Sequence, residues 1–560
     1  MCKKHTQELN IIQQENTQKN TKKLNKLKHF FLTNAFGILC SRIFGFLRDA
    51  MQAALLGTSI YSDIFFIAFK FPNMFRRVVS EGAFVQSFLP FFLSARKKGA
   101  FSISIFWIFV FFILMLSMLV MWFAPFITKI LALGYDKDRI ALAMPLVRIH
   151  FWYLILIFIV TYFSTLLQYK NIFWVNAYNT VLLNIAMIVA MIPYQFQTTL
   201  TDRELFQAVY VLSYSVLVGG VCQILIHFYP LYVSGIWRLQ YIGMLSLKRW
   251  YKDSGVTISF SGITFSKNNS KEKEVIVGQK KQVAVLGRYK KAKYHILRLM
   301  IDIKAFFKAF FPAMLGASTA QIIAIIDSSL ITLLPNSYGG VSVLNFANRI
   351  FQLPLAIFAI AISSALFPTI AKAIEKKDEK KALQNLRVAF WFLLITLSVC
   401  TLGGIILSNE IVWLLFERKN FTRADTLQVA WAFIGYMIGL LPFGLTRIFS
   451  LWLYAKKQQA KAAKYSVIAL ALGTMLSGVL ILSLRYFNIT DGILWDLRYF
   501  LVALAGSIGG FALMLFNIKA FGIRNFLAII QHRKYALYLL VALGVTFIIL
   551  QFFKHFFYIA

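Results

Sequence analysis

Arginines stand inside three otherwise apolar stretches of this sequence. Arg42 and Arg48 lie in "CSRIFGFLRDA", Arg76 and Arg77 in "FKFPNMFRRVVSEGAF", and Arg349 in "NFANRIFQLP". An arginine at the centre of a membrane helix costs at least about 2.5 kcal/mol, so each must face a partner or a wet cavity. Guanidinium groups stay charged and bind phosphate or pyrophosphate through paired hydrogen bonds. The pattern predicts an anion-binding cavity within the membrane.

The spacing of these arginines predicts how they share that cavity. Arg42 and Arg48 are six residues apart, about 120° from a common helix face, so they flank a cavity without pointing the same way. Arg76 and Arg77 point about 100° apart, so we expect one to face the cavity and the other to pair with Glu81, four residues after Arg77. The alternative for any single arginine is a helix-end position or an internal ion pair. Carboxylates in these helices are too few to neutralise the whole cluster.

The composition indicates the elements that position these residues. Of 560 residues, 59% are hydrophobic and 14% charged, whereas soluble domains carry about 25% charged residues. Apolar stretches of about 20 residues match the hydrocarbon core, where helices satisfy their own backbone groups. We therefore predict an all-α polytopic membrane protein. Thirteen spans are expected, near residues 31–57, 64–93, 101–131, 145–168, 172–194, 206–230, 305–334, 341–371, 388–416, 427–455, 462–486, 497–521 and 535–559.

The formal net charge of +37 reflects basic residues in the connections between spans. With the lysine-rich N-terminus in the cytoplasm, alternate connections such as "ARKKG", "EKKDEKK" and "AKKQQAKAAK" also fall there, as the positive-inside rule requires. This distribution indicates topology and no nucleic-acid partner. The four cysteines show no CxxC or Cys/His spacing, so neither a disulfide framework nor a metal site built on them is expected.

The chain divides by composition into five parts. We predict a basic cytoplasmic N-terminal extension (1–30), an N-lobe (31–230), a basic cytoplasmic insertion (231–304), a C-lobe (305–521) and a C-terminal span (522–560). The insertion contains the β-prone runs "VTISF" and "VAVLG", so a small or partly ordered cytoplasmic domain is expected. For its basic residues, a solvated loop that also contacts anionic lipid headgroups is favoured over a dedicated binding domain.

A weak internal repeat relates the lobes. Leu89-Pro90 and Phe367-Pro368 each precede a basic turn and are separated by six spans. An even separation gives both lobes the same orientation, as in parallel transporter repeats.

In the seventh span, Asp327 has no basic residue within one turn, so it is a candidate to bind Na⁺ or carry a proton. The alternative is an ion pair with Arg349.

Several strings resemble the MurJ (MviN) family of lipid II flippases: "SRIFGFLRDA", "SDIFFIAFKFPNMFRRVVSEGAFVQSFLPFF", "LNFANRIFQLP" and "FPTIAK". The resemblance runs from about Thr33 to Phe521, apart from the 231–304 insertion. It implies the fold of the MOP exporter superfamily, with two six-helix lobes around a central cationic cavity that opens alternately to the two sides. It also implies a transporter in the bacterial cytoplasmic membrane and no enzyme. The expected partners are lipid II and membrane lipids, the expected state is a monomer, and no cofactor beyond a candidate Na⁺ coupling ion is implied.

The same resemblance implies roles for individual residues. The pyrophosphate-binding set by motif is Arg42, Arg48, Arg76 and Arg349. The supporting or gating set is Asp63, Lys70, Pro72, Asn73 and Glu81. The acidic positions that loosely match the sodium site of some relatives are Asp327 and Asp425.

The chain departs from the family pattern at two places. Asn348 and Gln352 stand where some relatives carry acids beside the arginine, and many relatives have fourteen spans, the last two forming a groove for the lipid tail.

Two other functions stay open. One is another exporter of the superfamily, such as an O-antigen-unit flippase or multidrug exporter. The other is a polyprenyl-sugar glycosyltransferase or ligase, which needs a positioned acid or base in a large outer loop, whereas these outer connections are short.

Overall fold

The structure is a computed structural model. It describes residues 36–37, 39–78, 84–197, 200–254, 256–259, 262–265, 279–335, 339–456, 458–531 and 533–558. The predicted N-terminal extension, 1–30, and Glu81 lie outside these residues.

The N-lobe consists of a first helix, residues 39–56, followed by seven helices. These are α2 (Ile60–Phe75), α3 (Phe84–Ser94), α4 (Lys98–Trp122), α5 (Ala124–Leu131), α6 (Lys137–Tyr169), α7 (Trp174–Gln195) and α8 (Asp202–Val233). Polar side chains begin several of them: Asp136 accepts a hydrogen bond from the Arg139 amide before α6, and Thr201 forms a capping box with Glu204 at α8. These side chains satisfy amide groups that have no partner within the helix.

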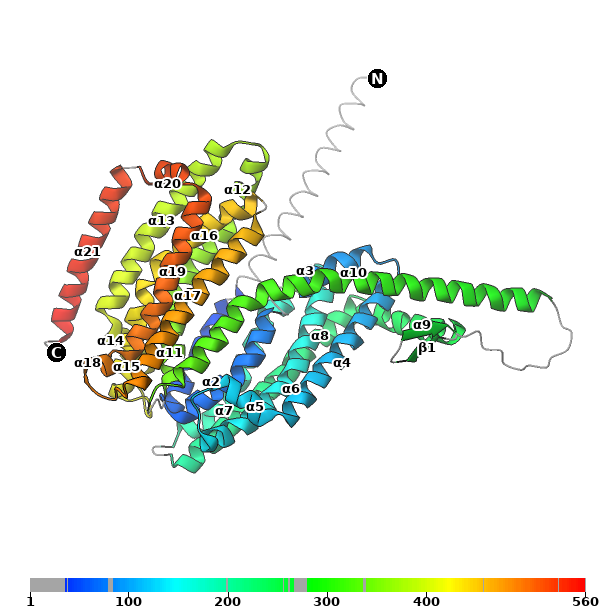
Figure 1. Cartoon of the computed structure of the whole chain (residues 1–560), viewed down its shortest axis with the longest axis horizontal. Helices are drawn as coiled ribbons and strands as arrows, with labels where there is room; N and C mark the ends of the chain where they lie inside the picture. The colour runs from blue at the N-terminus through cyan, green and yellow to red at the C-terminus, as the bar shows by residue number, and fades with distance from the viewer. Residues whose placement is uncertain are drawn as a thin grey trace, which may run out of the picture.

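The C-lobe and C-terminus form a second set of helices (Figure 1). They are α11 (Gly340–Pro354), the π-helical η2 (Leu355–Ile360), α12 (Ala361–Glu375), α13 (Glu379–Ile406), α14 (Ser408–Phe416), α15 (Arg423–Ile438), α16 (Leu440–Ala455), α17 (Gln459–Tyr486), α18 (Gly492–Asp496), α19 (Arg498–Phe521), α20 (Ile523–Ile530) and α21 (Arg533–Tyr558). The last helix, α21, packs against α13 at the edge of the lobe.

The segment between the lobes is more helical than expected. After α9 (Ile236–Ser254), a short antiparallel hairpin pairs β1 (Val256–Ser259) with β2 (Gly262–Phe265). The 53-residue α10 (Gln279–Ile331) then runs without a break into the predicted seventh span. "VTISF" therefore contributes a strand, but the strand interpretation of "VAVLG" is wrong because 283–287 belong to α10. The predicted boundary at 304/305 also falls inside α10.

Ten helices among the described residues are long and apolar enough to cross a membrane. They match ten of the thirteen predicted spans. The other three predicted spans coincide with the first helix, which carries three charged residues, with the interrupted α2–α3 pair, and with the C-terminal part of α10, where the apolar stretch Gln321–Ile331 is described. The polytopic helical prediction is confirmed, and the three exceptions all line the cavity described below.

The second and eighth spans are broken in the same manner. The second consists of α2, a π-helical turn at 76–78 and α3, while the eighth consists of α11, η2 and α12. Pro72 lies within α2, and Pro354 directly precedes η2. Because proline removes one helical hydrogen bond and crowds the preceding turn, it favours such irregular backbone. The shared break supports the internal repeat.

Aromatic packing fixes α10 to the N-lobe. The buried Phe306 ring lies 6.3 Å from Phe84 and 6.2 Å from Phe101, measured between ring centroids. Toward its other end, α10 contacts α17 of the C-lobe. One continuous helix thus contacts both lobes, as Figure 1 shows.

Replacing Phe306 with Ala should lower stability because a fully buried ring leaves a void that its neighbours only partly fill. The transfer free energy of the ring is small when the alternative environment is lipid. We therefore expect the free energy of unfolding to fall by an amount on the order of 2 kcal/mol, through the loss of packing contacts. Thermal unfolding in detergent measures it. Phe311→Ala, at a half-exposed position of the same helix, is the control. Equal effects of the two substitutions would contradict the anchoring role of Phe306.

Candidate functional site

A cavity of about 350 Å³ lies where the lobes meet. Its walls come from the first helix, α2 and α7 of the N-lobe, and from α10 and α11. Among the residues that the structure describes, six basic side chains and one carboxylate line it. The basic residues are Arg42, Arg48, Lys70, Arg76, Arg77 and Arg349; the acid is Asp49. A cavity with this excess of positive charge attracts anions, because charges interact more strongly there than in water.

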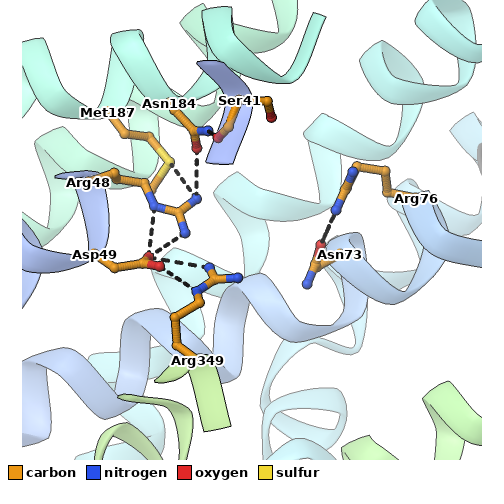
Figure 2. Close-up of polar contacts among 8 residues, drawn as sticks. All are labelled: Ser41, Arg48, Asp49, Asn73, Arg76, Asn184, Met187 and Arg349. Carbon is orange, nitrogen blue, oxygen red and sulfur yellow. Dashed lines mark hydrogen bonds and ion pairs between the residues drawn. The ribbon is translucent and has the colours of Figure 1, made fainter. Parts of the chain in front are cut away.

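One carboxylate holds two arginines from opposite lobes (Figure 2). Arg48 Nε donates to Asp49 Oδ1 over 3.1 Å, and Arg349 Nη2 donates to the same oxygen over 3.3 Å. Arg349 Nε also forms an ion pair with Asp49 Oδ2. Asp49 is buried, whereas 41% of the Arg349 side chain is exposed. Two cations share a single anion, so the group keeps net positive charge.

The Arg48 side chain is positioned from a third helix. Its Nη1 donates to Asn184 Oδ1 of α7 over 3.1 Å, and the Asn184 amide donates in turn to the Ser41 carbonyl over 3.3 Å. Figure 2 shows this chain of contacts above the Asp49 bridge. Asn184 therefore links α7 to the first helix and holds the guanidinium toward the cavity.

Arg76 stands across the cavity from the Asp49 bridge. Its Nη2 and Nε donate to Asn73 Oδ1 over 3.2 and 3.4 Å. Arg77 lines the cavity as well. Both arginines lie in the π-helical turn at 76–78, whose wider turn reduces the angle between successive side chains. The predicted pairing of one of them with Glu81 involves a residue outside the described ranges, so it stays a prediction.

The other predicted residues of the second span divide between the cavity and the helix interior. Lys70 and Asn73 line the cavity. Lys70 also lies close enough to Asp327 of α10 for their charges to interact. Pro72 is buried within α2 and is not among the lining residues.

Asp63 joins the lobes at one end of the cavity. Its Oδ1 accepts a 2.7 Å hydrogen bond from the Ser342 amide, in the first turn of α11. The N-terminus of a helix carries unpaired amides and partial positive charge, so a carboxylate there is stabilised. Gly339 precedes this turn with a φ of 81°, and a Cβ at that position would overlap the Thr58 carbonyl. The close approach of the two lobes thus requires glycine.

Further hydrogen bonds join the lobes beside Asp63. Thr58 donates through its hydroxyl to Asp425 Oδ1, and the Asn420 side chain donates to the Leu55 carbonyl over 2.7 Å. From α10, the Thr332 hydroxyl accepts a 2.9 Å bond from the Gly134 amide. Leu55 and Thr332 lie at the ends of predicted spans. The other residues, Thr58, Gly134, Asn420 and Asp425, belong to connections that the alternation of spans places outside the cell. The cavity is therefore sealed at that end.

The two predicted sodium-site residues lie in separate surroundings. Asp327 accepts a 2.6 Å hydrogen bond from Thr474 of α17, so its predicted alternative partner, Arg349, is wrong. Asp425 caps α15: its Oδ2 accepts from the Thr422 amide over 2.8 Å while Oδ1 accepts from Thr58. Among the described residues no three His, Cys, Asp or Glu side chains are grouped to hold a metal. Both Asp425 oxygens already accept hydrogen bonds, and the sodium site stays a prediction.

Sequence reasoning missed two residues of the bridge. Asp49 directly follows Arg48, and an adjacent pair on a helix points about 100° apart, which hid the contact that a long arginine side chain makes. Asn184 is an uncharged residue of the fifth span and carried no signal. Asp49 is the one carboxylate in the first apolar stretch, 31–57, and that was the signal available for it.

Residues 52–560 match the family described as lipid II flippase MurJ. The chain belongs to that family. The "probable lipid II flippase MurJ" of Helicobacter pylori strain J99 is 44% identical over 503 residues, which cover 90% of this chain and 97% of that protein. The protein of the same description from Buchnera aphidicola of Acyrthosiphon pisum is 30% identical over 465 residues, covering 80% and 78%.

Solved structures share the family's fold. A lipid II flippase MurJ in an inward closed conformation aligns with a TM-score of 0.64 at 21% identity, covering 94% of this chain and all of that one. An inward-facing multidrug transporter of the MATE family, from the MOP superfamily, aligns with a TM-score of 0.53 at 13% identity over 89% of this chain and 94% of that one. The predicted family and superfamily fold are confirmed.

Replacing Asp425 with Ala should remove its half of the α15 capping box, the contact with the Thr422 amide, together with the bond from Thr58. Loss of a cap costs about 1 kcal/mol, and loss of the second bond should add to it. Asp136→Ala, which removes the cap of α6, is the matched control. Thermal unfolding with and without Na⁺ tests both roles. If Na⁺ stabilises the wild type and Asp136→Ala but not Asp425→Ala, Asp425 is a sodium ligand after all.

Proposed function

We propose that this chain moves lipid II, a polyprenyl-pyrophosphate-linked disaccharide-peptide, from the inner to the outer leaflet of the bacterial cytoplasmic membrane by alternating access. One observation carries the proposal: Arg48 and Arg349, from opposite lobes, share the single carboxylate of Asp49 in a cavity with six basic side chains. Family membership supports the same cargo.

The bridge is suited to bind a pyrophosphate. Each guanidinium has further N–H donors, and a pyrophosphate offers oxygens in the paired geometry that arginine recognises. Asp49 holds the two guanidinium groups on either side of one carboxylate before the ligand binds. The arginine side chains therefore lose little conformational entropy when a pyrophosphate binds between them. Arg76, held by Asn73 on the other wall, can contact the same anion.

The Asp49–Arg349 contact also ties the lobes together at the centre of the cavity. A bound pyrophosphate competes with Asp49 for Arg349 and so weakens this tie. Binding of the anion then favours separation of the lobes, and the energy available equals the difference in affinity between the two arrangements. Asp63 at the α11 N-terminus would open and close the outer end.

The cavity volume limits what this conformation holds. About 350 Å³ is near the lower end of ligand pockets, enough for the pyrophosphate but small for the disaccharide-peptide. The lobes must therefore separate to admit the headgroup, while the polyprenyl tail stays in lipid. The described arrangement represents the outer end closed, with the N-terminus in the cytoplasm as the basic connections predict.

Substitution of the cavity arginines tests the proposal. Arg48→Ala, Arg76→Ala and Arg349→Ala should each abolish complementation of a strain depleted of its own flippase, because each removes a charge-assisted contact to the pyrophosphate. Lys at these positions should restore only part of the activity, because its ammonium group lacks the planar pair of N–H donors with which a guanidinium binds phosphate oxygens. The readout is growth together with the lipid-linked intermediate that accumulates on the inner leaflet.

Arg203→Ala provides the control, because Arg203 is exposed at the start of α8 and does not line the cavity. Membrane levels of every variant are measured by immunoblot. Wild-type growth of all three cavity variants at normal levels would reject the pyrophosphate site.

The membrane potential is expected to drive export. Moving one negative charge outward gains about 2.3 kcal/mol per 100 mV, so a pyrophosphate with about two charges gains roughly twice that. Collapsing the potential with the Na⁺ and proton gradients held constant should therefore stop transport, as measured by the outer-leaflet appearance of the precursor. Transport that continues without a potential and stops on Na⁺ removal would instead identify sodium as the driving ion.

A further inference from the structure

A second cavity, of about 450 Å³, lies away from the lobe interface. It is formed by the α3–α4 turn, α9 and the N-terminal half of α10, the two helices that project together beyond the N-lobe in Figure 1. Its walls consist of Lys97, Ile242, Leu245, Ser246, Arg249, Trp250, Asp253, Lys291, Ala292 and His295.

Close packing holds this pocket in shape. Trp250 and Ala292 are buried at its floor, together with Ala100 from the start of α4. The Trp250 ring stacks on His295 of α10, with ring centroids 4.8 Å apart. Gly243 of α9 meets Gly99 so closely that a Cβ on either residue would overlap the other's backbone. The pocket is therefore a packed junction of three elements.

Positive charge is in excess in the pocket. Its described lining contains three basic residues, one from each element, and one acid: Lys97, Arg249, Lys291 and Asp253. The pKa of His295 lies below its ordinary value, first because the ring is partly buried and then because Lys97 and Lys291 are close. The neighbouring cations thus act on a common point, where an anion would be bound.

The pocket stands at the surface of the membrane. Lys97 directly precedes the membrane helix α4, and α9 follows the membrane helix α8 after a two-residue turn. On α9, Ile242 and Leu245 line the pocket and are themselves 50% and 46% exposed. An apolar helix edge beside basic residues is the arrangement of helices that lie in the interface, with the apolar side toward acyl chains.

We propose that this pocket binds the phosphate headgroup of an anionic phospholipid in the leaflet where it lies. Lys97, Arg249 and Lys291 contact the phosphate, while Ile242 and Leu245 contact the first carbons of the acyl chains. The apolar edge favours a lipid over free phosphate, because inorganic phosphate would leave that edge uncovered. The site is separate from the pyrophosphate cavity, so it is independent of the transported cargo.

Lipid titration of the purified full-length protein tests the site. Native mass spectrometry follows binding of phosphatidylglycerol, and of phosphatidylcholine with the same chains, to delipidated protein. The combined variant Lys97→Gln, Arg249→Gln, Lys291→Gln should bind phosphatidylglycerol at least tenfold more weakly and leave phosphatidylcholine binding unchanged. Ser246→Trp keeps every charge but fills the pocket, and it should weaken phosphatidylglycerol binding to a similar extent.

The matched control removes equal charge from the same two helices outside the pocket. Lys248→Gln, Lys252→Gln, Lys290→Gln, all exposed residues, should change phosphatidylglycerol affinity less than twofold. Equal losses of phosphatidylglycerol affinity in both triple variants, or unchanged binding by Ser246→Trp, would show that the lipid responds only to the general positive charge of the surface. Either result would overturn the site. Displacement of phosphatidylglycerol by millimolar inorganic phosphate would overturn the lipid assignment in favour of free phosphate.

Discussion

The ion bridge at Asp49 is the interaction on which the rest of the site depends. A membrane interior tolerates charged groups only when they are paired or hydrated, so a lone guanidinium on the first helix or on α11 would oppose closure of the lobes. Asp49 makes closure favourable by pairing with Arg48 in its own lobe and Arg349 in the other. Because one carboxylate serves two arginines, the closed state keeps an excess of positive charge. In the proposed function the same contact both stabilises the empty protein and prepares the binding site for a pyrophosphate.

The helices around this bridge are the least regular in the protein. The first helix carries three charged residues, and the second and eighth spans are broken by π-helical turns. Breaks at the π-helical turns expose backbone groups that only a cavity or neighbouring protein can satisfy. Irregular backbone and buried charge therefore occur together in the helices that line the cavity.

The sequence predicted this arrangement in outline because the cost of charge in lipid leaves few choices. The cavity is lined by all four arginines predicted to bind the anion, Arg42, Arg48, Arg76 and Arg349, as a cluster of intramembrane arginines requires. The details depended on geometry that no linear pattern carries. Arg77 reaches the cavity through a π-helical turn, Asp425 caps a helix, and "VAVLG" joins α10 because a long helix overrides a short β-prone run.

The seal at the outer end differs in kind from the central bridge. Asp63 meets backbone amides at the α11 N-terminus, and its neighbours at this end, apart from the Thr58–Asp425 contact, exchange neutral hydrogen bonds through Asn420 and Thr332. Neutral hydrogen bonds contribute only about 1 kcal/mol each. The central ion pair, in contrast, can be replaced only by another anion. The proposed alternating access needs a gate that opens at low cost and a centre that responds to anionic cargo, and α11 contributes to both ends through the Ser342 amide and Arg349.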